Sequence, residues 1–120
     1  MSLRVLLVDD DPASLGSLSR LLEKRGYTVK AISDSRLARD TALEFKPAVV
    51  ILDYSMPVLH GGDVSWQIAT DPFLRDTRII ISSAFSDEEF RRKLPDKPIS
   101  ILPKPLDFEA LVKLIEEGSP

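Results

Sequence analysis

Cysteine is absent from the 120 residues of this chain, and so are long hydrophobic runs and an excess of positive charge. Without cysteine, the chain cannot form a disulfide framework, a thiolate zinc site or a cysteine nucleophile. The longest uninterrupted apolar run, Ala48 to Leu52, is far shorter than the roughly 20 residues that span a bilayer. These absences argue against disulfide-stapled, thiol-dependent and helical membrane-spanning proteins.

The charge balance is mildly acidic, because 16 Lys and Arg residues stand against 19 Asp and Glu residues. Sequence-independent DNA binding needs a basic face, so we expect no direct contact with nucleic acid. Apolar residues form 43% of the chain, which is typical of a folded domain. The opening Met-Ser-Leu-Arg leads straight into a short apolar run and is not typical of a signal peptide. We therefore expect one cytoplasmic domain over residues 1–120, with no membrane contact and no effector domain.

Short apolar or β-branched runs alternate with stretches of helical periodicity along the chain. The runs are Val5–Val8, Thr28–Ile32, Val49–Leu52, Ile79–Ile81 and Ile99–Leu102. Strands that alternate with helices indicate βαβ units and a parallel sheet, and continuous apolar strands indicate helices on both of its faces. The sequence therefore predicts an α/β fold: a doubly wound, flavodoxin-like parallel sheet of five strands in the order 2-1-3-4-5, with five helices.

The helix boundaries are indicated by capping residues and by prolines. The first helix is expected to start at Pro12 behind a capping Asp11 and to end before Gly26. The other expected helices are Ser35–Phe45, Asp63 to about Thr70, a short polar helix opened by the capping box Ser86-x-x-Glu89, and a last helix with Phe108, Leu111, Val112 and Ile115 on its apolar face.

Polar residues gather where the predicted strands end. These residues are Asp9-Asp10-Asp11, Asp53, Ser82-Ser83 and Lys104-Pro105. Ligands of doubly wound sheets bind outside the carboxyl ends of the strands, so Asp9, Asp10 and Asp53 should converge. Because three carboxylates repel one another, a hard cation with oxygen ligands fits there, and Mg²⁺ fits best. Asp53 is then placed to accept a phosphoryl group whose oxygens Ser83 and Lys104 hold.

Each of these residues also has a simpler structural interpretation. Asp11 fits a helix cap better than a metal ligand, and Asp53 alone would be read as a cap before a turn. Ser83 alone is a turn residue, and Lys104 alone is a solvated charge. The joint occurrence of polar residues at four strand ends, all at one edge of the sheet, favours the phosphoryl-acceptor interpretation.

The same segments resemble the receiver domain of bacterial two-component response regulators (CheY-like proteins). The matching segments are Leu6-Leu7-Val8-Asp9-Asp10-Asp11-Pro12, Val50-Ile51-Leu52-Asp53-Tyr54-Ser55-Met56-Pro57, Gly61, Ile80-Ile81-Ser82-Ser83-Ala84 and Lys104-Pro105. The spacings are specific as well, with 30 residues from Asp53 to Ser83 and 21 from Ser83 to Lys104. The resemblance extends over nearly the whole chain.

The resemblance implies a phosphoacceptor and a metal site. Asp53 would receive a phosphoryl group from the phosphohistidine of a sensor histidine kinase or a histidine phosphotransfer protein. Asp10, Asp53 and the backbone carbonyl of Ser55 would bind Mg²⁺ directly, and Asp9 would act through water. The chain would then be a signalling switch rather than an enzyme, with only self-phosphorylation and slow self-dephosphorylation as its chemistry.

The resemblance also implies how the switch responds. Ser83 would move toward the phosphoryl group, and Lys104 would pair with a phosphoryl oxygen. The Lys104–Pro105 peptide is usually cis in this family. The face formed by the fourth helix, the fifth strand and the fifth helix would then repack and meet a downstream effector domain or a second copy.

Three positions depart from the family pattern or stand outside it. Ile101 replaces an aromatic residue whose rotamer usually couples to the switch hydroxyl, and isoleucine has no ring to swing. His60, the only histidine, is expected to be solvent-exposed and not to donate a phosphoryl group. Trp66 is expected to anchor the third helix by packing.

Three other functions fit parts of the pattern. A hydrolase of the haloacid-dehalogenase type would use Asp9 in Asp9-x-Asp11 as its nucleophile, but the acidic pair expected after the lysine is missing, because Asp107 stands alone. A receiver fold that serves only for docking agrees with Ile101 but not with the complete set of acids, hydroxyl and lysine. Flavin binding fails, because an acidic loop after the first strand repels the cofactor phosphate.

Overall fold

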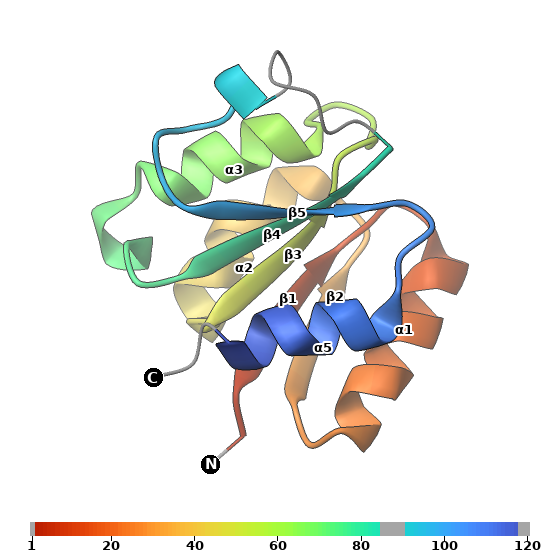
Figure 1. Cartoon of the computed structure of the whole chain (residues 1–120). Helices are drawn as coiled ribbons and strands as arrows, with labels where there is room; N and C mark the ends of the chain where they lie inside the picture. Colours follow the sequence, from red (N-terminus) through yellow and green to blue (C-terminus); the bar gives the residue numbers. More distant parts are fainter. Residues whose placement is uncertain (1, 85–90, 118–120) are drawn as a thin grey trace.

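Five parallel strands form the centre of the molecule in the computed structural model, which describes residues 2–84 and 91–117. The strands are β1 (Arg4–Val8), β2 (Thr28–Ile32), β3 (Val49–Asp53), β4 (Arg78–Ser83) and β5 (Ile99–Pro103). Their order is β2-β1-β3-β4-β5, and every neighbouring pair is parallel (Figure 1). The predicted strand order is therefore confirmed.

Helices cover both faces of this sheet. They are α1 (Pro12–Lys24), α2 (Ala38–Phe45), α3 (Gly61–Ala69) and α5 (Phe108–Glu117), with short 3-10 turns η1 (Ser35–Leu37) and η2 (Pro72–Leu74). Figure 1 shows α1 and α5 on one face and α2 and α3 on the other. The helix predicted from Ser86 and Glu89 begins outside the described residues. Within the described ranges, no helix has the length and apolar character needed to cross a membrane.

The side chains of the central strands point alternately into two cores. Leu6, Val8 and Leu52 pack under α2 and α3, whereas Leu7 and Ile51 pack under α1 and α5. All five side chains are almost fully buried. This two-sided burial explains why β1 and β3 are continuous apolar runs in the sequence, and it gives the residues that follow these strands a rigid base.

Side-chain caps mark the starts of α1 and α3, and the cap of α1 confirms a prediction. The Asp11 carboxylate accepts hydrogen bonds from the Ala13 backbone N–H at 3.1 Å and from the Ser14 hydroxyl at 2.9 Å, so Asp11 is the N-cap of α1. These hydrogen bonds, with that from Ser14 first, lower the pKa of the Asp11 carboxyl. Beyond the other end of α1, Gly26 has a positive φ of 94°, as expected for the residue that stops a helix.

Two predicted helix boundaries were wrong. The helix expected from Ser35 begins as the 3-10 turn η1, which Asp34 caps through the Arg36 backbone N–H, and α2 itself starts at Ala38. The helix expected from Asp63 begins at Gly61, because the His60 ring nitrogen Nδ1 accepts a hydrogen bond from the Asp63 backbone N–H at 3.2 Å.

Candidate functional site

Strand register brings the predicted site residues to one edge of the sheet. Val8 of β1 pairs with Leu52 of β3, so the residues that follow them, Asp9 and Asp53, leave the sheet side by side. In the same way, Ser83 of β4 pairs with Pro103 of β5, and Lys104 follows directly. Since every strand is parallel, all these residues emerge at the same end of the sheet.

Three carboxylates meet at this edge. Oxygen atoms of Asp9, Asp10 and Asp53 lie within 4.8 Å of one another. Asp53 is buried, Asp9 is half-buried and Asp10 is exposed. The predicted convergence is therefore present, and it produces a concentration of negative charge that the formal net charge of −3 does not reveal.

The concentration of negative charge affects the pKa of Asp9. Burial raises the pKa of its carboxyl from 3.8 to about 6, and the nearby charges of Asp53 and Asp10 add to the rise. A hydrogen bond from the Asp11 backbone N–H to Asp9 Oδ1, at 3.0 Å, opposes the rise only in part. A cation beside Asp9 would therefore stabilise the ionised carboxylate.

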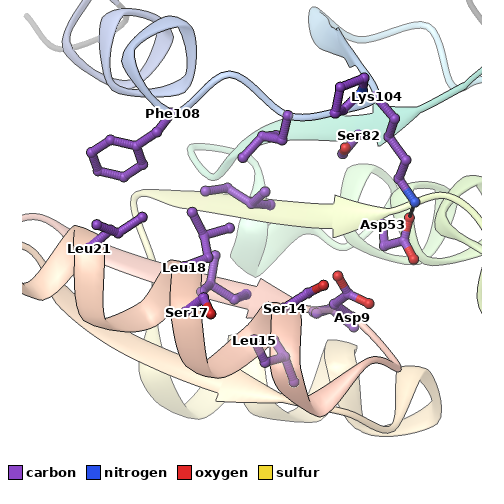
Figure 2. Close-up of a pocket in the computed structure, with 15 residues that line it drawn as sticks. Asp9, Ser14, Leu15, Ser17, Leu18, Leu21, Asp53, Ser82, Lys104 and Phe108 are labelled. Carbon is purple, nitrogen blue, oxygen red and sulfur yellow. Dashed lines mark hydrogen bonds and ion pairs between the residues drawn. The ribbon is translucent and has the colours of Figure 1, made fainter.

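Lys104 reaches across the edge to Asp53. Its ammonium group donates a hydrogen bond to Asp53 Oδ1 and forms an ion pair with it, as Figure 2 shows. The backbone N–H of Lys104 also donates to the carbonyl of Ser83 at 3.1 Å, which ties the start of this loop to β4. The Lys104–Pro105 peptide is cis, as the resemblance implied.

The two serines assigned to the site differ in burial. Ser83 is the last residue of β4 and is only 1% exposed, so its side chain is enclosed beside the strand ends. Ser55 lies in the loop after β3, two residues beyond Asp53, and is exposed. Ile101 is half-buried in β5, beside Ile81 of β4, and packs against the core under α2 and α3.

The junction between β3 and α3 contains contacts that sequence reasoning did not anticipate. A Cβ atom at Gly61 would lie 2.8 Å from the carbonyl oxygen of Asp53 and 2.8 Å from Tyr54 Cα, so only glycine fits there without a shift. The His60 ring lies 4.9 Å from the Tyr54 ring, centroid to centroid, and it caps α3. The motif glycine was visible in the sequence, but its contact with the backbone of Asp53 was not.

Two further apolar residues near α3, Val58 and Trp66, are exposed rather than packed in the core. Val58 has a φ of 67°, and the Leu59 N–H donates to the Pro57 carbonyl across it at 2.8 Å, which forms a γ-turn. Trp66 was predicted to anchor α3 by packing, but it is 45% exposed. Its indole N–H donates to the Lys93 carbonyl at 2.8 Å, so a hydrogen bond attaches α3 to the segment before β5.

Comparison with known proteins agrees with this geometry. The family model for the response regulator receiver domain matches residues 5–116. Protein PilH of Pseudomonas aeruginosa is 32% identical over 114 residues, which cover 93% of this chain and 93% of PilH. Response regulator MprA of Mycolicibacterium vanbaalenii is 35% identical over 113 residues, which cover 93% of this chain. The match spans only 48% of MprA, or about half the length of that relative.

A solved structure shares the fold. The receiver domain of the sensor histidine kinase PA1611 from Pseudomonas aeruginosa, solved with a magnesium ion coordinated in its active-site cleft, superposes with a TM-score of 0.84. The two sequences are 23% identical, and the alignment covers 98% of this chain and 97% of that one. From the family match over residues 5–116 and the identity with PilH over nearly all of its length, this chain belongs to the response regulator receiver domain family.

Proposed function

We propose that this chain is the phosphoacceptor domain of a two-component phosphorelay and that Asp53 takes the phosphoryl group from a phosphohistidine. One observation carries this proposal: three carboxylates lie within 4.8 Å of one another, and the ammonium of Lys104 pairs with the buried one, Asp53. Receiver domains are signalling switches of two-component systems, and a sensor kinase or a histidine phosphotransfer protein would be the donor.

The donor set at this edge fits Mg²⁺. Carboxylate and carbonyl oxygens are the ligands that this ion prefers, and the raised pKa of the Asp9 carboxyl indicates a place where a cation is favourable. Asp10, Asp53 and the backbone carbonyl of Ser55 would hold the ion, with Asp9 acting through water. When bound, Mg²⁺ neutralises the carboxylates and the negative charge of the incoming phosphoryl group. The magnesium ion in the PA1611 receiver domain supports this assignment.

The transfer itself exchanges one bond for another. A carboxylate oxygen of Asp53 forms a bond to phosphorus while the P–N bond of the donor phosphohistidine breaks. The electron pair of that bond stays on the imidazole nitrogen, which then takes a proton from water. Lys104 releases the carboxylate and holds a phosphoryl oxygen, and the Ser83 hydroxyl donates a hydrogen bond to another. The product is an acyl phosphate on Asp53.

The phosphoryl group then acts as a charge switch. It adds about −1.5 to −2 of charge, which draws Ser83 and Lys104 toward it. The face that includes β5 and α5 repacks, and a downstream effector domain or a second copy detects the change. Water later attacks phosphorus slowly, and the carboxylate of Asp53 is the leaving group. We place this activity in a single cytoplasmic domain, residues 1–120.

Mass spectrometry after incubation with acetyl phosphate and MgCl₂ tests the acceptor. The wild-type chain should gain the mass of one phosphate, and Asp53→Asn should gain none. Asp34→Asn is the matched control, because Asp34 is an acid that caps η1 and lies outside the acid cluster. Label that persists in Asp53→Asn but is lost in Asp9→Asn would support the hydrolase alternative instead. No label in the wild-type chain would support a domain that serves only for docking.

A further inference from the structure

A cavity of about 380 Å³ lies between α1 and α5 and continues to the acid cluster. We call it the α1–α5 groove and define it by Asp9, Asp53 and Lys104 at its inner end and by Leu18, Leu21 and Phe108 at its outer end. Figure 2 shows the charged groups at one end and the apolar side chains at the other. We propose that this groove binds a small amphipathic organic cation, that is, an amine with an aromatic or short alkyl body.

The outer part of the groove is apolar and already formed. Leu21 is 44% exposed at its rim, while Leu18 and Phe108 are half-buried and face the same space. The Arg25 guanidinium bonds to the Glu109 carboxylate at 2.7 Å and lies 5.5 Å from the Phe108 ring centroid, so it joins the end of α1 to α5. The groove volume is within the range of small-molecule sites, and an apolar body that fills it removes hydrophobic surface from water.

The charge at the inner end selects the head group of the ligand. Asp53 is already paired with Lys104, and Asp10 does not line the groove. Asp9 lines the groove but has no ion-pair partner among the described residues, and its hydrogen bond comes from the Asp11 backbone N–H. Lys104 pairs with Asp53 and balances the charge of Asp9 only in part, so the inner end of the groove attracts an ammonium group and repels an anion. A neutral apolar ligand would add no positive charge beside Asp9.

Occupancy of the groove has a regulatory consequence, which rests on the proposed function. Mg²⁺ and the amine both need the charge of Asp9, so each should weaken binding of the other. An amine in the groove should therefore slow phosphorylation of Asp53. Binding itself does not depend on phosphorylation and can be measured without it.

Calorimetric titration of the whole chain with 4-phenylbutylamine tests the binding site. From the ligand efficiency of small molecules, we expect a Kd of about 1 mM without Mg²⁺. The alcohol of the same shape, 4-phenylbutanol, should bind about tenfold more weakly because it lacks the charge. MgCl₂ should raise the apparent Kd of the amine and leave that of the alcohol unchanged.

Substitutions then locate the two ends of the groove. Asp9→Asn should weaken amine binding about tenfold, and Leu21→Gln should weaken amine and alcohol alike by several-fold. Leu37→Gln is the matched control, because Leu37 is similarly exposed, at 51%, and lies on η1 outside the groove. A thermal unfolding curve for each variant establishes that it is folded.

Three results would overturn the proposal: equal binding of amine and alcohol, wild-type amine binding by Asp9→Asn, or no binding of the amine at several millimolar. Failure of the proposed function has a different signature. In that case the amine binds and depends on Asp9, but acetyl phosphate leaves no label on Asp53 whether or not the amine is present.

Discussion

Asp9 combines partial burial with two neighbouring carboxylates, and its pKa of about 6 in the folded chain lies above its ordinary value of 3.8. The folded state therefore holds the Asp9 proton more tightly than the unfolded state does. The contribution of the protonated Asp9 to the free energy of unfolding is fully present below pH 3.8 and is lost as the pH rises through about 6. At neutral pH and without a cation, the ionised Asp9 carboxylate lowers the free energy of unfolding.

Removal of this charge should stabilise the metal-free chain. We expect Asp9→Asn to raise the free energy of unfolding at pH 7.5 by about 1 kcal/mol, a value reduced for solvent screening. The gain should shrink as the pH is lowered from 6 toward 4, because the wild-type carboxyl then becomes protonated. Urea unfolding at several pH values, with a chelator present, measures it. A gain that is independent of pH would mean that charge is not its cause.

Val58 stores backbone strain in the loop after β3. Its φ of 67° is unfavourable for a β-branched residue, and its side chain is 75% exposed, so little packing compensates. Val58→Gly should raise the free energy of unfolding by about 1 kcal/mol, because glycine has no Cβ to oppose a positive φ. Val58→Thr is the control, since it keeps the branched Cβ and should leave stability unchanged. Equal urea midpoints for the wild-type chain and both variants would contradict the assignment of strain.

At the scale of elements, the start of α3 is held against the strand that carries Asp53. Gly61→Ala would place a methyl group 2.8 Å from two backbone atoms, which cannot move without a shift of Asp53 or Tyr54. We expect a loss of about 2 kcal/mol in the free energy of unfolding, together with slower labelling by acetyl phosphate.

Gly16→Ala provides the matched control for this substitution. Gly16 lies inside α1, and the nearest atom to an added methyl is an Arg20 side-chain nitrogen at 3.9 Å. Alanine favours helix over glycine by about 1 kcal/mol, so this variant should be more stable than the wild-type chain. Thermal unfolding of both variants should therefore give shifts of opposite sign. Shifts of the same sign would show that the backbone contact at Gly61 is not what distinguishes the two sites.

Sequence periodicity was sufficient to predict the strand order and the convergence of Asp9, Asp10 and Asp53. The carboxyl ends of parallel strands lie at one edge of the sheet, whatever the orientation of the individual side chains. The true start of α3 depends on His60, whose side chain caps the helix although histidine is not among the usual N-cap residues. Partial exposure of Trp66 depends on where the segment around Lys93 lies, which is set by tertiary structure. The α1–α5 groove likewise depends on how two distant helices are spaced.

At the scale of the whole molecule, one small domain carries both the acid cluster and the face, including β5 and α5, that would transmit the signal. Two acids of the cluster follow β1, the third is the last residue of β3, and the lysine follows β5, so a change at the cluster acts on three strands of one sheet. Stability of the entire fold should therefore respond to whatever binds the cluster, because a ligand that prefers the folded state shifts the unfolding equilibrium.

Mg²⁺ provides the direct test of this coupling. At a concentration ten times its Kd, a ligand that binds only the folded state adds about 1.4 kcal/mol to the free energy of unfolding, or about 5 °C in Tm for a domain of this size. We expect MgCl₂ to raise Tm by this amount at pH 7.5 and a chelator to reverse the rise. Asp10→Asn should abolish the response, while Asp34→Asn, an acid outside the cluster, should keep it. An equal rise in all three chains would indicate a general salt effect rather than a site at the carboxylates.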